Sequence, residues 1–146
     1  MYDVVKSLHS YWAYLVLVIL TIAAINAIIK FLGDKEYEAN DFRKSLFTLI
    51  VSHIQLLIGL VLYFVSPRLQ LFSESGMGEI MKDSVNRLYL VEHPLINIIA
   101  VALITIGYSK HKKKLTSKAK SKMIAIFYTI ALLLFLSRIP WSAWIG

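Results

Sequence analysis

The stretch VEHPLINIIAVALITIGY (Val91–Tyr108) decides the fold of this chain. It places an acid, a histidine and a proline directly ahead of an uncharged apolar run, and a lysine-rich block follows it. An apolar segment of this length, charged only at its ends, predicts a helix that crosses a membrane. His93 and Asn97 share one face of that helix, because residues i and i+4 are neighbours. Polar groups inside a bilayer usually face a bundle interior and carry function, so the central question is what His93 faces.

The composition of the whole chain also indicates a membrane protein. Of its 146 residues, 58% are apolar and 17% are charged, which is too apolar for an ordinary soluble domain. The absence of cysteine excludes disulfides, thiolate metal sites and covalent c-type haem attachment. The net charge of +7 is assigned to membrane topology rather than to a nucleic-acid partner, because the cations stand between apolar segments. The first apolar segment has no cleavage site after it, so we expect it in the mature protein.

Four apolar segments are long enough to cross a bilayer. Their expected limits are about 11–29, 45–65, 90–108 and 123–139, in a single membrane domain over residues 1–146. Most connections are short, so neighbouring helices should run antiparallel. The sequence therefore predicts an all-α integral membrane protein built as an up-down-up-down four-helix bundle. Glu79–Leu90 is expected to form an amphipathic surface helix, and Asn40 or Asp41 is expected to cap the second long helix.

The distribution of lysine and arginine predicts the orientation in the membrane. Segments 30–44 and 110–122 together hold eleven of these cations, and the rest of the chain holds five. Cytoplasmic loops carry the excess of lysine and arginine. Both short loops are therefore expected in the cytoplasm, with both termini and the long connection 66–90 on the outer side.

Three of the four histidines lie at or inside different spans. From a helix rise of ~1.5 Å per residue, His53 lies close to mid-membrane, whereas His9 and His93 share the outer half. Two neutral imidazoles that face each other across a bundle core are what axial ligation of haem iron needs. His53 joins this pair only if the second helix is shifted outward; otherwise it pairs with one of them, ligates a second haem or carries protons. His111, in the lysine block, is expected to be a solvated loop residue.

Four other residues support the same site, each with a simpler explanation. Gly59 would let a flat ring approach the second helix, although glycine is common in membrane helices for packing alone. Arg138 and Arg87 lie on the outer side, where haem propionates would need cations, and interfacial snorkelling explains them equally well. Glu92 could orient His93 or accept a proton, or it could be only a favourable partner of the helix dipole.

The phrases LHSYWAYLVL, SHIQLLIGLVLYFVSP and VEHPLINIIAVALITIGYSK, with the closing RIPW, resemble a family of small bacterial four-span membrane proteins described as cytochrome-b-like or uncharacterised. The resemblance covers nearly the whole chain. It implies a four-helix fold in the bacterial cytoplasmic membrane, haem b and electron transfer. At the matching positions, His9, His53 and His93 would be the iron ligands. The fourth span has no histidine, so two bis-histidine haems would lack a ligand, and one haem or none is favoured.

Three classes of function follow from these observations. The first is a b-type haem protein that passes electrons, for example between a quinol and a redox partner, with no catalytic activity beyond electron transfer. The second is a non-enzymatic accessory subunit of a larger membrane complex or homo-oligomer, with structural or proton-relaying histidines. The third is a small transporter, channel or metal-handling protein that uses the same histidines for a divalent ion. Against the third, no carboxylate lies deep in any span.

Overall fold

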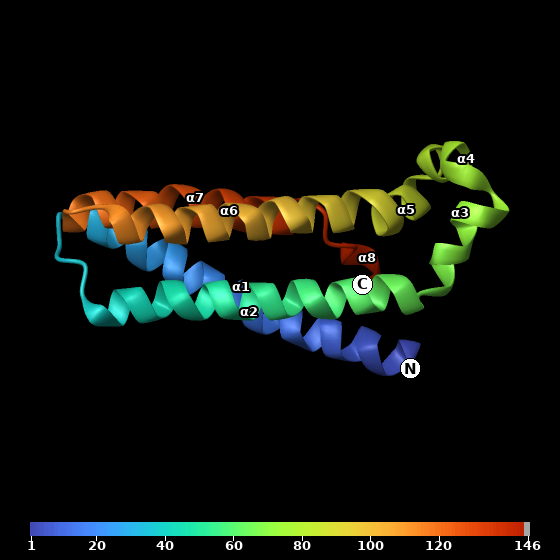
Figure 1. The fold of residues 1–146 in the computed structure, drawn as a ribbon, viewed down its shortest axis with the longest axis horizontal. Coiled ribbons are helices and arrows are strands. Elements are labelled where there is room, and N and C mark those ends of the chain that lie inside the picture. Colours follow the sequence, from blue (N-terminus) through green and yellow to red (C-terminus); the bar gives the residue numbers. More distant parts are fainter. Residues whose placement is uncertain (145–146) are drawn as a thin grey trace.

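The computed structural model describes residues 1–144, and no strand occurs among them. Four long helices dominate the fold (Figure 1). They are α1 (Tyr2–Leu32), α2 (Ala39–Val65), α6 (His93–Lys113) and α7 (Ser117–Ser137). Three of them, and the helical stretch Ser84–Lys113 that contains α6, are long and apolar enough to cross a membrane. This confirms the prediction of an all-helical chain with four candidate spans.

At the ends next to the turns 33–38 and 114–116, all four long helices extend beyond the apolar limits expected from the sequence, because their backbone hydrogen bonds continue into polar residues. At the other ends, α1 also begins earlier than expected, α2 ends at the expected Val65, α6 begins at His93 and α7 ends at Ser137, two residues before the expected limit. The start of α2 shows the extension most clearly. Its N-cap residue is Glu38 rather than Asn40 or Asp41, but Asp41 does cap the helix as the acidic member of a capping box, so that prediction is confirmed for Asp41 in part. Asp41 occupies the third helical position, where its carboxylate accepts a hydrogen bond of 2.7 Å from the backbone N–H of Glu38. An acid here also favours the positive end of the helix dipole.

Five short helical pieces connect α2 to α6. They are η1 (Pro67–Gln70), α3 (Leu71–Glu74), α4 (Gly76–Lys82), α5 (Ser84–Arg87) and η2 (Leu88–Glu92). The prediction of one amphipathic helix over Glu79–Leu90 is therefore wrong. Asp83 breaks it, because its backbone is extended and its carboxylate accepts from the N–H groups of Val85 and Asn86. A last short helix, α8 (Trp141–Trp144), follows Pro140.

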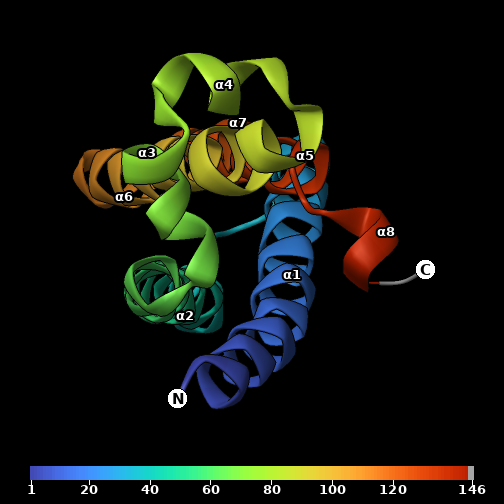
Figure 2. The same cartoon turned by 90° about the vertical axis from the view of Figure 1, so that its right-hand side faces the viewer.

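The four long helices form a ring of contacts. α1 packs against α2 and α7, and α6 packs against α7 and α2, so α1 and α6 are diagonal partners. Figure 2 shows the same arrangement end-on. The turns 33–38 and 114–116 lie together at one end of the long axis, which we call the loop end (Figure 1). The opposite end holds the N-terminus and the connection 66–92, and we call it the histidine end.

The apolar core is concentrated toward the loop end. On α1 it begins at Val16, on α2 it includes Val51 and nothing later, and on α6 it begins at Ala100. Small side chains at buried positions let these helices approach closely. The fully or nearly buried hydrophobic members are Val16, Leu20, Ala23, Ala24, Ala27, Val51, Ala100, Val101, Ile104, Ile124, Tyr128, Ala131 and Phe135. The outer turns of α1, α2 and α6 add none to this cluster.

Buried polar groups at the loop end are held by hydrogen bonds and one ion pair. Asp41 is 3% exposed and accepts from Asn26 at 2.8 Å, and its carboxylate lies 3.3 Å from the ammonium nitrogen of Lys30. The hydroxyls of Tyr37 and Ser45 lie 2.7 Å apart, and the buried Tyr128 donates to the Ser45 carbonyl at 2.8 Å. These bonds tie α1, α2 and α7 together.

His111 is fully buried, so the expectation of a solvated loop residue is wrong. The helix α6 continues past it to Lys113, and the spacing Ile104, Gly107, His111 keeps it on the inward face. Its ring contacts the rings of Tyr37 and Tyr108, and also that of Phe42. One position in this lysine-rich segment, His111, therefore faces the interior of the bundle.

Candidate functional site

The structure brings together two histidines at the histidine end. The rings of His9 on α1 and His93 on α6 have centroids 6.1 Å apart and planes at 82°. Both side chains are half-buried. Since α1 and α6 are diagonal partners, the two rings meet across the middle of the bundle rather than along one helix interface.

His93 is held by hydrogen bonds to both ring nitrogens. Its Nδ1 lies 2.8 Å from the backbone carbonyl oxygen of Arg138, which can only accept, so Nδ1 carries the proton. The Nε2 atom of the neutral ring then accepts from the amide of Asn97 at 3.0 Å. This is the arrangement that usually fixes the tautomer of a metal-binding histidine, with the outer nitrogen donating to a carbonyl.

The backbone ahead of His93 has an unusual conformation. The π-helix η2 ends at Glu92, and Pro94 follows in the first turn of α6. Proline is tolerated there because the first turn leaves N–H groups without helical partners. Short π-helical segments within α-helices are frequent at functional sites. Here the π-helix ends directly before His93 and the proline follows directly after it.

His9 lies against the second helix. A Cβ added to Gly59 would lie 3.3 Å from Cε1 of the His9 ring, so the glycine makes room for this imidazole. The side-chain amide of Gln55 donates to the backbone carbonyl of His9 at 2.9 Å. The ring that approaches Gly59 is thus an imidazole of the same chain.

Three buried polar atoms around the two rings have no hydrogen-bond partner among the described residues. They are Nδ1 of His9, Oε1 of Gln55 and Oδ1 of Asn97. Buried polar groups without a partner cost free energy, and they call for a water molecule, an ion or a ligand. Their location beside the His9–His93 pair makes this the candidate site.

An ion-pair network surrounds the outer edge of the site. The carboxylate of Glu92 lies 2.8 Å from Nε of Arg87 and 3.5 Å from Nε of Arg138. Arg138 therefore contributes to the site through its backbone carbonyl, while its side chain, 45% exposed, is engaged with Glu92. The assignment of Arg138 to haem propionates stays a prediction, and it would require this pair to rearrange.

His53 does not join the pair. Its side chain is exposed on α2, where Nδ1 lies 2.8 Å from the carbonyl oxygen of Leu49. Its Nε2 lies 3.3 Å from the hydroxyl of Thr105 on α6. His53 is thus directed to the α2–α6 surface, and its role as an iron ligand stays an untested prediction.

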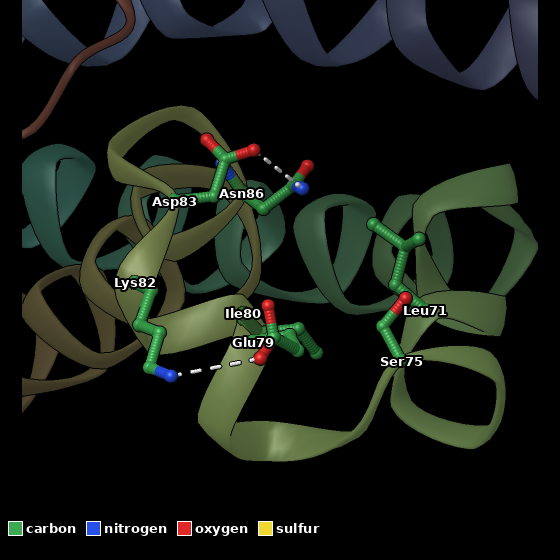
Figure 3. A pocket seen from close by; sticks show the side chains of 7 residues that line it. All are labelled: Leu71, Ser75, Glu79, Ile80, Lys82, Asp83 and Asn86. Atoms are coloured by element: carbon green, nitrogen blue, oxygen red, sulfur yellow. Dashed lines mark hydrogen bonds and ion pairs between the residues drawn. The ribbon is translucent and has the colours of Figure 1, made fainter.

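Two open surface hollows lie away from the histidines. One, of about 430 Å³, is lined by Leu71, Ser75, Glu79, Ile80, Lys82, Asp83 and Asn86 (Figure 3). Its charged groups are used within the connection between α2 and α6, since Lys82 pairs with Glu79 and Asp83 caps α5. The other, of about 630 Å³, lies between Tyr2 and residues 64–73. Neither borders His9 or His93.

The separation of the His9 and His93 rings can be compared with that of two imidazoles that ligate one metal ion. With each metal–nitrogen bond ~2 Å long, two imidazoles on opposite sides of one ion have ring centres roughly 6 Å apart. The 6.1 Å separation matches this value. His93 already has the orienting hydrogen bond, and His9 has an unpartnered ring nitrogen. Asn97 would have to release Nε2 of His93 for the ion to bind.

Sequence reasoning identified Asn97 as the i+4 neighbour of His93, whereas the contact of Gln55 with the backbone of His9 is seen only in the structure. It missed the part played by the Arg138 carbonyl, because a backbone group leaves no mark in the sequence. It also missed the π-helix, since no residue pattern in Leu88–Glu92 predicts one. The hydrogen bond between His93 and the Arg138 carbonyl is seen only once α6 and α7 are packed together.

Comparison with known proteins adds no relative. No family model, no curated protein and no solved structure matches this chain.

Proposed function

We propose that this protein is a membrane-embedded b-type haem protein that transfers electrons, with the iron held non-covalently between His9 and His93. The observation that carries the proposal is the 6.1 Å separation of two imidazoles from diagonal helices. The unpartnered polar atoms beside them support it. The absence of cysteine is consistent with haem held only by histidine ligation and packing.

Each residue of the site has a distinct part in this proposal. His93 supplies Nε2, while its Nδ1–H stays on the Arg138 carbonyl and fixes the ring orientation. His9 on α1 would be the second residue to hold the haem, with Gly59 leaving space for its ring. Bound haem would supply one-electron chemistry, and the apolar helices around it would exclude water. A quinone or a protein redox partner would exchange the electrons.

The membrane arrangement is part of the same proposal. Trp12, early in α1, bonds to Val51 in the middle of α2, and Asn26, late in α1, bonds to Asp41 at the start of α2. The two helices therefore run antiparallel. This supports an up-down-up-down bundle in a bilayer. The cations concentrated at the loop end support a cytoplasmic position for that end, with both termini outside. The bacterial cytoplasmic membrane is the location that the resemblance implies.

The test is a pair of absorbance spectra, oxidised and dithionite-reduced, on protein purified in mild detergent after haem-supplemented expression. We expect a b-type α band on reduction and a stoichiometric amount of extractable haem. His9→Ala and His93→Ala should each lose the haem. His53→Ala is the matched control, because this exposed histidine lies apart from the pair, and it should keep the haem. Equal haem content in all three variants would remove the ligand assignment.

The second candidate is a non-enzymatic accessory subunit of a larger membrane complex. One observation favours it: both ring nitrogens of His93 have hydrogen-bond partners within the chain, as in a structural histidine. A colourless protein after haem-supplemented expression would favour this candidate. Reproducible co-purification with other membrane subunits would then support it, whereas a colourless protein without partners would not.

A further inference from the structure

The charge of this protein is divided unequally between its two ends. Segments 30–44 and 110–122, which meet at the loop end, hold eleven Lys and Arg against four Asp and Glu. The rest of the chain holds five of each. The whole net charge of +7 therefore belongs to the loop end, and the remainder of the molecule is neutral.

The cations at the loop end have few acidic partners. Segment 110–122 contains no acid at all. Among the described residues, the only ion pair at this end joins Lys30 to the buried Asp41. Six lysines of segment 110–122 are solvent-exposed: Lys110, Lys112, Lys113, Lys114, Lys118 and Lys122. Their mutual repulsion destabilises the protein unless an external anion compensates it.

Three lysines at this end lie over aromatic rings. The ammonium nitrogens of Lys112, Lys118 and Lys120 lie 5.2, 5.4 and 5.6 Å from ring centres. The rings belong to Tyr108, Phe31 and Phe42 in that order. Such contacts hold the ammonium groups at the border of the apolar surface. In a membrane this border is the level of the lipid head groups.

The first turns of α2 and α7 differ in charge. The first turn of α2 contains Asp41, which suits the positive end of the helix dipole. The first turn of α7 contains no acid. Lys118 and Lys120 lie there instead, and they oppose the dipole. Folding of α7 alone gains nothing from this arrangement, whereas an adjacent anion would interact favourably with both the lysines and the helix.

We propose that the loop end binds the head groups of anionic phospholipids in the adjacent leaflet, with the exposed lysines of segment 110–122 as the contacts. Each lysine near an anionic membrane surface strengthens binding about fivefold. Lysine acts as a point charge toward phosphate, so affinity should follow head-group charge and not acyl-chain structure. The proposal is independent of whether the histidine end holds haem.

The test uses full-length protein in nanodiscs that contain phosphatidylglycerol and phosphatidylcholine in equal amounts in both leaflets, so that orientation has no effect. Native mass spectrometry then measures which lipids stay bound. We expect several-fold enrichment of phosphatidylglycerol on the wild type. Lys113→Gln with Lys114→Gln should bring this enrichment down toward equal retention of the two lipids, because each lysine near an anionic surface strengthens binding about fivefold. Sodium chloride should weaken it, since exposed charges are screened.

The matched control is Lys6→Gln with Lys82→Gln, which also removes two positive charges but at the histidine end. It should leave the enrichment unchanged. In neutral detergent, neither double variant should unfold at a lower midpoint than the wild type, which separates loss of lipid binding from loss of folding. Equal retention of both lipids by the wild type, or equal loss in the two double variants, would overturn the proposal. Displacement of the lipid by inorganic phosphate, beyond that by sodium chloride at equal ionic strength, would also overturn it in favour of a phosphate site.

Discussion

The loop end and the histidine end of the bundle treat buried groups differently. At the loop end, an apolar core surrounds polar groups, and the most costly of them, the carboxylate of Asp41 and the ammonium of Lys30, are paired. Some atoms there also lack partners, including Nε2 of His111. At the histidine end, the outer turns of α1, α2 and α6 add no side chain to the core cluster, and unpartnered atoms lie around two imidazoles. Paired buried charges within an apolar core provide stability, whereas buried polar atoms without partners call for a water molecule, an ion or a ligand.

The largest difference in stability between the two ends is expected when an ion pair is broken at each of them. Asp41→Ala leaves Lys30 and Asn26 without their partner at a nearly buried position. Breaking a buried pair in this way typically costs about 3–5 kcal/mol. We expect a large fall in the midpoint of thermal unfolding in detergent. Glu79→Ala, at the histidine end, breaks a pair whose side chains are 66% and 77% exposed, so its midpoint should not change. Similar falls in the unfolding midpoint of the two variants would contradict the difference in stability between the two ends.

The two helix glycines provide the next comparison. A Cβ at Gly107 would lie 2.4 Å from Cβ of Phe127, where α6 meets α7. Overpacking of this kind costs about 1–3 kcal/mol, so Gly107→Ala should lower the unfolding midpoint clearly. At Gly59 the nearest atom is 3.3 Å away and belongs to the side chain of His9, which can move. Gly59→Ala should therefore cost less stability. A larger fall in the unfolding midpoint for Gly59→Ala than for Gly107→Ala would show that the histidine end is the more closely packed of the two.

The stability of the loop end should depend on pH through Tyr37. Burial, as the main cause, raises the pKa of Tyr37 to about 12, with the nearby charge of Asp41 adding to the effect and the hydrogen bond to Ser45 opposing it. The folded protein therefore holds this proton more tightly than the unfolded chain, whose tyrosine pKa is 10.0. This contribution is complete below about pH 10 and is lost as the pH rises toward 12.

Tyr37→Phe isolates that contribution. The variant should be less stable than the wild type at pH 9, since it lacks the hydrogen bond to Ser45. Between pH 10 and 12 the difference in unfolding midpoint should shrink, because only the wild type loses the tyrosine contribution. Parallel curves for the two proteins over that interval would argue against a buried Tyr37.

The smallest effect on stability is expected at His9. His9→Phe replaces a ring whose Nδ1 has no hydrogen-bond partner within residues 1–144. Removing an unpartnered buried polar group is nearly neutral or slightly stabilising. The unfolding midpoint of haem-free protein should therefore stay within error of the wild type, while the haem-binding capacity proposed above is lost. A loss of stability as large as that of Gly107→Ala would show that His9 is a structural residue.

Several features of this molecule can be predicted from residue order alone. The apolar lengths are sufficient to identify four spans, because a bilayer demands a fixed length of helix regardless of how helices pack. Helix rise places His9 and His93 in the same outer half of the membrane, since depth along one helix depends only on residue count. His111 shows the limit of this reasoning. Its lysine-rich surroundings indicate solvent, yet one inward position of a long helix is enough to bury it.

The number of spans, the helical class and the concentration of charge at one end are properties of the sequence, because they follow from local composition and from the thickness of a bilayer. Which groups meet is a property of the tertiary structure. Packing places His9 opposite His93, directs His53 to the α2–α6 surface, and brings the Arg138 carbonyl to the His93 ring. Such contacts depend on how each helix is rotated about its axis, and that rotation is set by packing between helices far apart in the sequence.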